Sequence, residues 1–190
     1  IRDRDNIKRR IMKRFPFKFT EAQERVIKEI TADMSSPVPM NRLLQGDVGS
    51  GKTAVAVYAI LAVVANGRQV AFMAPTSILA EQHFKTFDRM LRDSKVRYCL
   101  LSGGMKSSVR EKMLEAVRKG EMDVVIGTHA LIQKDVVFND LALVIVDEQH
   151  KFGVLQRKEL SEKGGNTDLL LMTATPIPRT LSMTAYGEYD

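Results

Sequence analysis

The feature that most constrains the fold is a glycine-rich segment that separates a short apolar run from a longer one. Residues 46–53 read Gly-Asp-Val-Gly-Ser-Gly-Lys-Thr. Glycines let backbone N–H groups turn toward phosphate oxygens, and a lysine and a hydroxyl residue then open a helix. Residues 42–45 fit the preceding strand and residues 53–65 the following helix, as a nucleotide-binding P-loop requires. The candidate phosphate-binding residues are Gly46, Gly49, Ser50, Gly51, Lys52 and Thr53.

Apolar segments that we expect to be strands alternate with amphipathic segments that we expect to be helices. The expected strands are residues 42–45, 69–74, 96–101, 123–127, 141–146 and 168–172. The expected helices are residues 21–34 with Thr20 as N-cap, 53–65, 77–91, 107–119, 156–163, and one that begins near 178. Continuously apolar strands that alternate with helices predict an α/β fold with a mostly parallel central sheet and helices on both faces. Ligands of such sheets bind at the carboxyl ends of the strands.

A second motif follows one of these strands. Residues 143–146 are apolar and end in Asp147 and Glu148, 95 residues after Lys52. A carboxylate at the tip of a strand beside the P-loop would complete a magnesium site with Thr53. We therefore assign Asp147 to Mg²⁺, with water between them, and Glu148 to the orientation and activation of an attacking water.

The catalytic set that we expect is Lys52, Asp147 and Glu148, because phosphoryl transfer depends on positioning the nucleophile and neutralising charge. His150 follows closely, but His83 and His129 do not lie at metal-ligand spacing from it. We interpret His150 as part of the nucleotide site, in a polar relay to a partner.

Composition excludes several classes of protein. With 44% hydrophobic and 27% charged residues, the chain has the composition of a globular protein. No apolar run approaches the roughly 20 residues that span a bilayer, so we expect no membrane partner. Cys99 is the only cysteine, which excludes a disulfide framework and fits a small buried side chain in a reducing, cytoplasmic protein.

Positive charge is concentrated at the N-terminus. Of the 29 Lys and Arg residues, eight lie in residues 1–18 with two Asp, which leaves 21 basic and 21 acidic residues in the remainder. We interpret residues 1–18 as a basic arm, either a solvated linker or a helix, and residues 19–190 as one domain. Contact of the arm with phosphates is the alternative. Because the chain begins with Ile1, we expect it to be a piece of a larger protein.

Residues 147–150, Asp-Glu-Gln-His, behind a P-loop resemble the superfamily 2 helicases and translocases. Four other stretches agree in order with the motifs of that superfamily. They are residues 17–23 for the Q motif, 75–82 for motif Ia, 126–131 for motif Ib or its neighbour, and 173–180 for motif III.

Within that superfamily the chain is most similar to the bacterial RecG branch-migration helicases, over nearly all of residues 17–190. The transcription-repair coupling translocases share most of these motifs. They usually carry an aromatic residue where Ser50 stands and Glu-Gln where Gln149 and His150 stand, so both positions favour RecG. Lys151 replaces the usual Arg, which is a mild departure.

The resemblance implies a first RecA-like motor domain that uses ATP and Mg²⁺. Phe17 would pack on the adenine base, and Gln23 would read its edge. Residues expected near the DNA backbone are Thr76, Gly103, Thr128 and His129, although Gly103 also fits a simple turn and Thr128 a helix cap. Residues expected to couple nucleotide state to domain motion are Gln149, Thr173 and Thr175.

We therefore expect the ATP-binding motor domain of an enzyme, an ATP-dependent DNA helicase that remodels branched double-stranded DNA in recombination and repair. Its partners would include the second RecA-like domain and the wedge domain of the same parent chain. The alternatives are the motor of a transcription-repair coupling translocase and a nucleotide-dependent binding module without turnover. Without the second domain and its arginine finger, we expect residues 1–190 to be nearly inactive.

Overall fold

The computed structural model describes residues 5–147, 163 and 166–174 of the 190-residue chain. Its helices are α1 (Asp5–Met12), α2 (Glu21–Met34), α3 (Lys52–Val64), α4 (Ser77–Leu91), α5 (Ser107–Arg118) and the 3₁₀ helix η1 (His129–Ile132). Its strands are β1 (Asn41–Gln45), β2 (Gln69–Met73), β3 (Tyr98–Leu101), β4 (Val124–Gly127), β5 (Leu141–Asp147) and β6 (Asp168–Thr173). Residues 156–162 of the helix expected at 156–163, and the helix expected near 178, lie outside the described residues.

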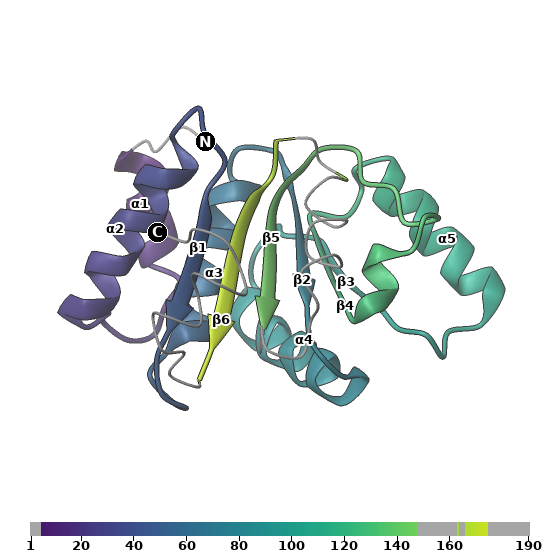
Figure 1. Cartoon of the computed structure of the whole chain (residues 1–190), viewed down its shortest axis with the longest axis horizontal. Coiled ribbons are helices and arrows are strands. Elements are labelled where there is room, and N and C mark those ends of the chain that lie inside the picture. Colours follow the sequence, from purple (N-terminus) through teal and green to yellow (C-terminus); the bar gives the residue numbers. More distant parts are fainter. Residues whose placement is uncertain (1–4, 148–162, 164–165, 175–190) are drawn as a thin grey trace, which may run out of the picture.

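The six strands form one sheet in the order β1-β6-β5-β2-β4-β3, and all five pairings are parallel (Figure 1). Each expected strand is present, with bounds that differ by one or two residues. Parallel neighbours need crossover connections, and here helices or long segments supply them. The predicted α/β fold with a parallel central sheet is confirmed.

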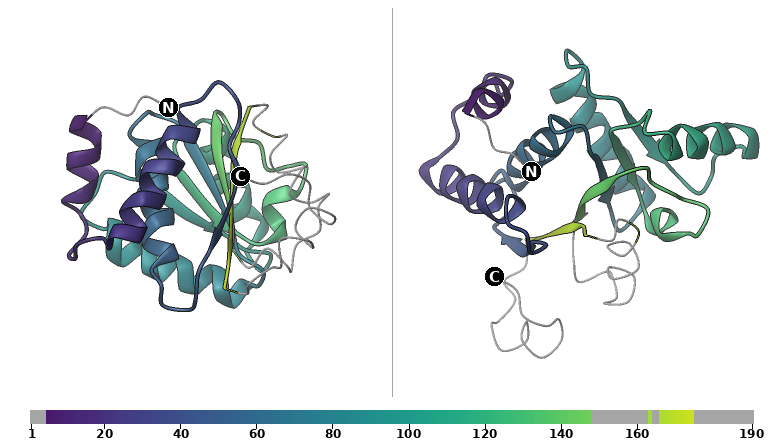
Figure 2. Two further views of the ribbon diagram at one scale, coloured as in Figure 1. Left: turned by 60° about the vertical axis from the view of Figure 1, so that its left-hand side comes forward. Right: turned by 90° about the horizontal axis from the view of Figure 1, so that it is seen from above.

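Alternate residues of the strands face two separate apolar layers. On one side, Phe72 of β2 and Ile145 of β5 pack in the cluster that includes α1, α2, α3 and α4. On the other side, Met73 and Val146 pack with residues of α5 and η1. Figure 2 shows α2 and α3 on one side of the sheet and η1 on the other. Both faces are covered, which explains why the strand sequences are apolar without alternation.

Side-chain caps and ion pairs fix α2 beside β1. The Thr20 hydroxyl accepts from Gln23 N at 3.2 Å and the Gln23 side chain accepts from Thr20 N at 2.9 Å, which is a capping box. Arg42 of β1 donates to the carboxylates of Asp33 at 2.6 Å and Glu29 at 2.8 Å. The capping box fixes the start of α2, and the two ion pairs hold its last turns beside the amino end of β1.

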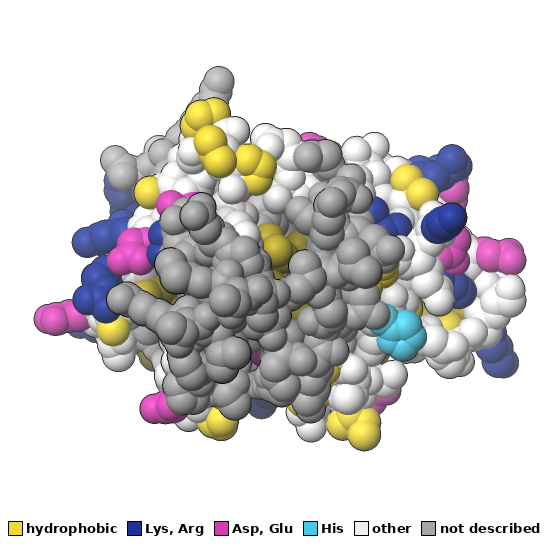
Figure 3. All heavy atoms as spheres, viewed as in Figure 1, with side chains coloured by type: hydrophobic (Ala, Val, Ile, Leu, Met, Phe, Trp, Pro, Cys, Tyr) yellow, Lys and Arg dark blue, Asp and Glu magenta, His cyan; other side chains and the backbone are white. Residues whose placement is uncertain are grey.

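The basic arm contains a helix that contributes to the core. Ile11 of α1 and Phe15 are only 5% and 7% exposed, and both belong to the cluster that contains α3. Residues 5–12 of this segment therefore form a helix, and Ile11 and Phe15 are buried in the core and not solvated. In Figure 3, Lys and Arg side chains gather over α1 and α2 at one end and over α5 at the other, with Asp and Glu among them.

Cys99 is buried in β3, as expected for a small apolar side chain. Burial raises the pKa of its thiol to about 12, so the reactive thiolate is scarce at neutral pH. In the described part of the chain, no helix has the length and apolar character that crossing a bilayer demands.

Replacing Ile11 by alanine tests whether α1 belongs to the folded unit. Loss of a buried isoleucine side chain should lower the free energy of unfolding by about 2–5 kcal/mol, measured by urea denaturation. The matched control is Arg10→Ala on the exposed side of the same helix, which should stay within about 0.5 kcal/mol of wild type. Equal effects of the two variants would contradict the packing of α1.

Candidate nucleotide-binding site

Strand register brings the two sequence motifs to one edge of the sheet. Gln45, the last residue of β1, pairs with Thr173 of β6, and Asp147, the last residue of β5, pairs with Met172 of β6. Adjacent strands are about 4.8 Å apart, so the end of β1 and Asp147 lie about 10 Å apart across β6. Gly46, where the glycine-rich loop begins, is bonded through its N–H to the Thr173 carbonyl at 3.2 Å.

The loop between β1 and α3 has a backbone that requires glycine at two positions. Gly49 has φ +82° and Gly51 has φ +86°, a left-handed conformation that other residues rarely adopt. Gly51 is the N-cap of α3, and no side chain caps that helix terminus. The first turn also carries no acidic residue. Its backbone N–H groups and the helix dipole therefore favour an anion at this end.

Lys52 extends into the loop, where its ammonium group donates to the carbonyl oxygens of Gly46 and Asp47. The bond to Asp47 measures 2.9 Å. These contacts hold a positive charge against the turn that precedes α3, next to the N–H groups of its first turn. The arrangement matches the chemistry of a phosphate cradle, in which backbone donors and one cation surround anionic oxygens.

Gln23 contacts the same loop from α2. Its amide Nε2 donates to the Ser50 carbonyl at 2.9 Å, while its Oε1 accepts from Thr20 N. Both ends of this side chain are therefore engaged within the protein. A Cβ on Gly51 would lie 2.3 Å from Gln23 Nε2, so the close approach depends on glycine at that position. Reading of an adenine edge by Gln23 stays a prediction.

Phe17 lies in an aromatic cluster before α2. Its ring centroid is 5.6 Å from that of Phe15 and 5.7 Å from that of Phe19, yet its side chain is 46% exposed. The inner rings are buried, and Phe19 makes an edge contact with Tyr58 of α3. Phe17 thus offers an aromatic surface to solvent, as a residue that stacks on a base must.

Asp147 has a partner that the sequence did not indicate. His83 Nε2 of α4 lies 2.6 Å from Asp147 Oδ2, and the two side chains are 13% and 15% exposed. Sequence analysis considered His83 only as a metal ligand to pair with His150. The two residues of the contact are 64 positions apart, and no local pattern joins them. The signal that could have found it is the adjacency of β2, which precedes α4, and β5.

The other residues expected at the nucleotide side divide into two groups. Thr53 lies in the first turn of α3 and is partly buried, and Thr173 is fully buried on β6 beside the loop. Glu148, Gln149, His150 and Thr175 lie outside the described residues, so their predicted roles stay predictions.

The residues expected near DNA follow three adjacent strands at the same edge of the sheet. Thr76 after β2 is exposed and caps α4, accepting from Leu79 N at 3.2 Å. Gly103 after β3 lies in an exposed turn, and a Cβ added there would meet nothing within 4 Å. Thr128 after β4 is 5% exposed, whereas His129 beside it is exposed. His129, and not Thr128, is therefore the accessible residue of this turn.

The donor set fits a magnesium ion that is carried by a nucleotide. Within the described residues, no group of three or more His, Cys, Asp or Glu side chains could hold a metal alone. Mg²⁺ keeps several waters and takes only one or two protein ligands beside phosphate oxygens. One carboxylate, Asp147, at the edge that carries the phosphate cradle and Thr53 suits that mode of binding.

Comparison with known proteins identifies the family. The model of the DEAD/DEAH box helicases matches residues 20–184, so the chain belongs to that family. The chain is also 56% identical to the ATP-dependent DNA helicase RecG of Bacillus subtilis over 95% of its residues. It is 50% identical to that of Escherichia coli over 98%. The predicted resemblance to the RecG helicases is confirmed.

Comparison with solved structures also points to the RecG helicases. A RecG structure bound to a three-way DNA junction matches 97% of the chain with TM-score 0.85 and 49% identity. A DEAD box protein from Methanococcus jannaschii matches 98% of the chain with TM-score 0.70 at 23% identity, and it supports the fold alone. The chain spans 26% of the Bacillus RecG and 25% of the junction-bound chain, so it corresponds to about a quarter of these proteins.

Alanine substitutions at Gly49 and Gly51 should distinguish the cost of the left-handed backbone from the cost of a steric clash. Gly49→Ala should lower the free energy of unfolding by about 1–2 kcal/mol through the left-handed backbone alone, because nothing lies within 4 Å of its added Cβ. Gly51→Ala should cost more, because its Cβ also displaces the Gln23 amide from Ser50. Denaturant unfolding of both variants measures the difference. Equal losses of stability in the two variants would contradict a stabilising role for the hydrogen bond from Gln23 to Ser50.

Proposed function

We propose that the chain is the ATP-binding motor domain of a DNA helicase that remodels branched DNA and is driven by ATP hydrolysis. One observation carries the proposal: the loop that holds Lys52 and the carboxylate of Asp147 lie at the same edge of three adjacent strands, β1, β6 and β5. A nucleoside triphosphate and its divalent ion are the ligand that uses both groups together.

In this proposal the residues have distinct roles. The N–H groups of the loop and Lys52 bind the phosphates, and Thr53 and Asp147 hold Mg²⁺, which neutralises charge on the phosphate oxygens. Binding requires Lys52 to exchange a loop carbonyl for a phosphate oxygen. Phe17 packs on the base, and Glu148 orients the attacking water. His150 belongs to the polar relay beside Glu148.

The proposed substrate is branched double-stranded DNA, in keeping with the junction-bound RecG structure. The backbone would pass along the turns after β2, β3 and β4, where Thr76, Gly103, Thr128 and His129 lie. The residues that would relay nucleotide state are Gln149, Thr173 and Thr175.

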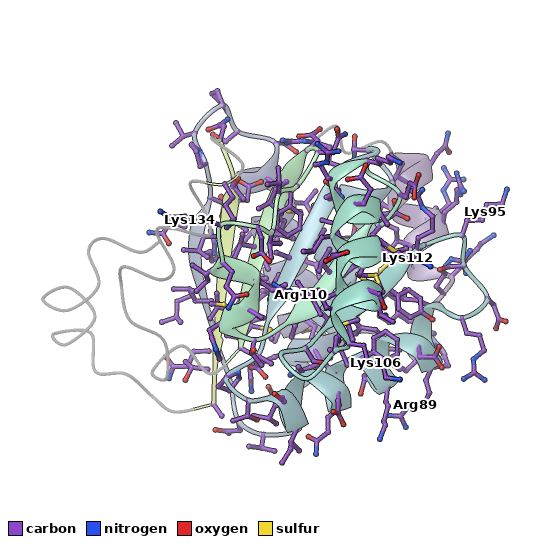
Figure 4. The ribbon with its side chains drawn as sticks, turned by 90° about the vertical axis from the view of Figure 1, so that its right-hand side faces the viewer. Arg89, Lys95, Lys106, Arg110, Lys112 and Lys134 are labelled. Atoms are coloured by element: carbon purple, nitrogen blue, oxygen red, sulfur yellow. The ribbon has the colours of Figure 1, made fainter. Side chains whose placement is uncertain are left out.

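Exposed cations extend this edge. Figure 4 shows Arg89 and Lys106, which follows Gly103 in the chain, toward the lower end of the side face, and Lys95 and Lys134 toward its upper end. Cations at the lower end, which carries the carboxyl ends of the strands, would neutralise DNA phosphates.

The proposed assembly is larger than this chain. Residues 19–190 would be the first RecA-like domain and residues 1–18 the arm that joins it to a preceding part. A second RecA-like domain would supply an arginine finger, and a wedge domain would open the branch. The relatives named RecG favour this assembly over a transcription-repair coupling translocase. We place the protein in the cytoplasm, where a lone buried cysteine stays reduced.

The isolated chain should bind ATP weakly and hydrolyse it very slowly. An arginine finger contributes about 10³–10⁵ in rate, so its absence should leave turnover lower than that of the full-length protein by about this factor. A phosphate-release assay with and without branched DNA measures it. Turnover near the full-length rate, stimulated by DNA, would contradict the division of the catalytic site between two domains.

Replacing Glu148 by glutamine in the full-length protein tests hydrolysis against a role as a binding switch. The proposal expects a loss of about 10²–10⁴ in ATP turnover with nucleotide binding retained, because the amide cannot accept the proton of water. Glu121→Gln, an exposed glutamate after α5, is the matched control and should keep wild-type turnover. Unchanged turnover in Glu148→Gln would show that another group acts as the base.

A further inference from the structure

The contact between His83 and Asp147 joins helix α4 to the proposed metal ligand. The Nε2–Oδ2 distance is 2.6 Å, which is a hydrogen-bond distance. Two ligands of a single Mg²⁺, each about 2.1 Å from the ion and at right angles, would lie about 3 Å apart. The geometry therefore describes a histidine bonded to the carboxylate, and not two side chains set to share an ion.

The ring of His83 packs against two phenylalanine rings. Its centroid lies 4.6 Å from that of Phe72 in β2 and 6.2 Å from that of Phe87 one turn along α4. Both phenylalanines are fully buried and contact each other edge to face at 5.0 Å. Because aromatic packing and the helix backbone fix the ring, the direction in which Nε2 points is set before any ligand binds.

We propose that His83 is a positioning residue for Asp147, which it orients toward the metal and nucleotide. This proposal rests on the function proposed above for Asp147. The terminal torsion of an aspartate is broad, so the plane of a carboxylate is not fixed by its rotamer alone. A hydrogen bond from a rigid ring to Oδ2 selects one plane, as outer partners commonly do for carboxylate ligands of metals.

The direction of the hydrogen bond follows from the acceptor. An ionised carboxylate accepts and cannot donate, so the proton of the contact lies on Nε2 of His83. The side chain must therefore supply an N–H at this place, and the ring must supply bulk against Phe72. These two properties can be separated by mutation.

The test compares His83→Phe with His83→Gln. Phenylalanine keeps an aromatic ring against Phe72 and Phe87 but removes the donor, whereas glutamine keeps an N–H at similar reach and removes the ring. The readout is the factor by which Mg²⁺, relative to EDTA, tightens binding of the fluorescent nucleotide mant-ATP to the chain. Thermal melting of each variant checks that it is folded.

We expect His83→Phe to reduce this Mg²⁺-dependent factor about tenfold, with the affinity in EDTA unchanged. His83→Gln should restore most of the factor. Tyr98→Phe is the matched control, because it removes a hydrogen bond at 2.8 Å to Asp88 on the same helix, away from Asp147. It should keep the wild-type factor.

A second readout needs no nucleotide. Nitrogen NMR of the histidine rings should show His83 with its proton on Nε2, and Asp147→Asn should shift that signal. A wild-type factor in His83→Phe, or a His83 signal that Asp147→Asn leaves unmoved, would overturn the proposal. If Asp147→Asn itself leaves the Mg²⁺-dependent factor unchanged, the assignment of Asp147 to the metal fails, which is a separate result.

Discussion

Parallel pairing of β1, β6 and β5 is the interaction on which the rest of the site depends. The hydrogen bonds of β6 to both neighbours set the register that puts Gln45, Thr173 and Asp147 at one edge. A slip of one residue would turn the side chains of a strand to the opposite face. Because both faces of this sheet are buried, the two apolar layers specify the register strongly.

The contacts around the glycine-rich loop tie it to its surroundings on three sides. Gln23 of α2 donates to the Ser50 carbonyl, and the Lys52 ammonium donates to the carbonyls of Gly46 and Asp47 within the loop. The Thr173 carbonyl of β6 accepts from Gly46 N. Thr173 lies on the strand between the loop and Asp147. A change in the loop when phosphate binds would therefore act directly on β6, which leads into the stretch that resembles motif III. On the other side, α4 begins at the exposed Thr76 and carries His83 about two turns along, against Asp147.

The sequence was sufficient for the fold because its signals are local and repeated. Apolar strands such as residues 141–146 and capped helices such as 21–34, opened by Thr20, carry their own patterns, and the parallel sheet follows from their alternation. The P-loop likewise has a short-range signature, because its backbone needs glycine at Gly49 and Gly51.

What the sequence did not predict depends on contacts between distant segments. Ile11 lies in a segment whose charge suggested solvent, and its burial depends on α3. The hydrogen bond between His83 and Asp147 joins residues 64 positions apart on different elements. The hydrogen bond from Gln23 to Ser50 depends on how α2 packs beside the loop. No spacing rule encodes such pairs, since each is fixed only after the sheet order is known.

The most direct test of the account is a crystal structure of the chain with Mg²⁺ and a non-hydrolysable ATP analogue. The account predicts that the Lys52 ammonium leaves the Gly46 or Asp47 carbonyl for a phosphate oxygen. It also predicts that the Asp147 carboxylate faces the ion, directly or through one water. A nucleotide bound elsewhere, or an ion bound at the phosphates with Asp147 turned away and Lys52 still on both loop carbonyls, would contradict it.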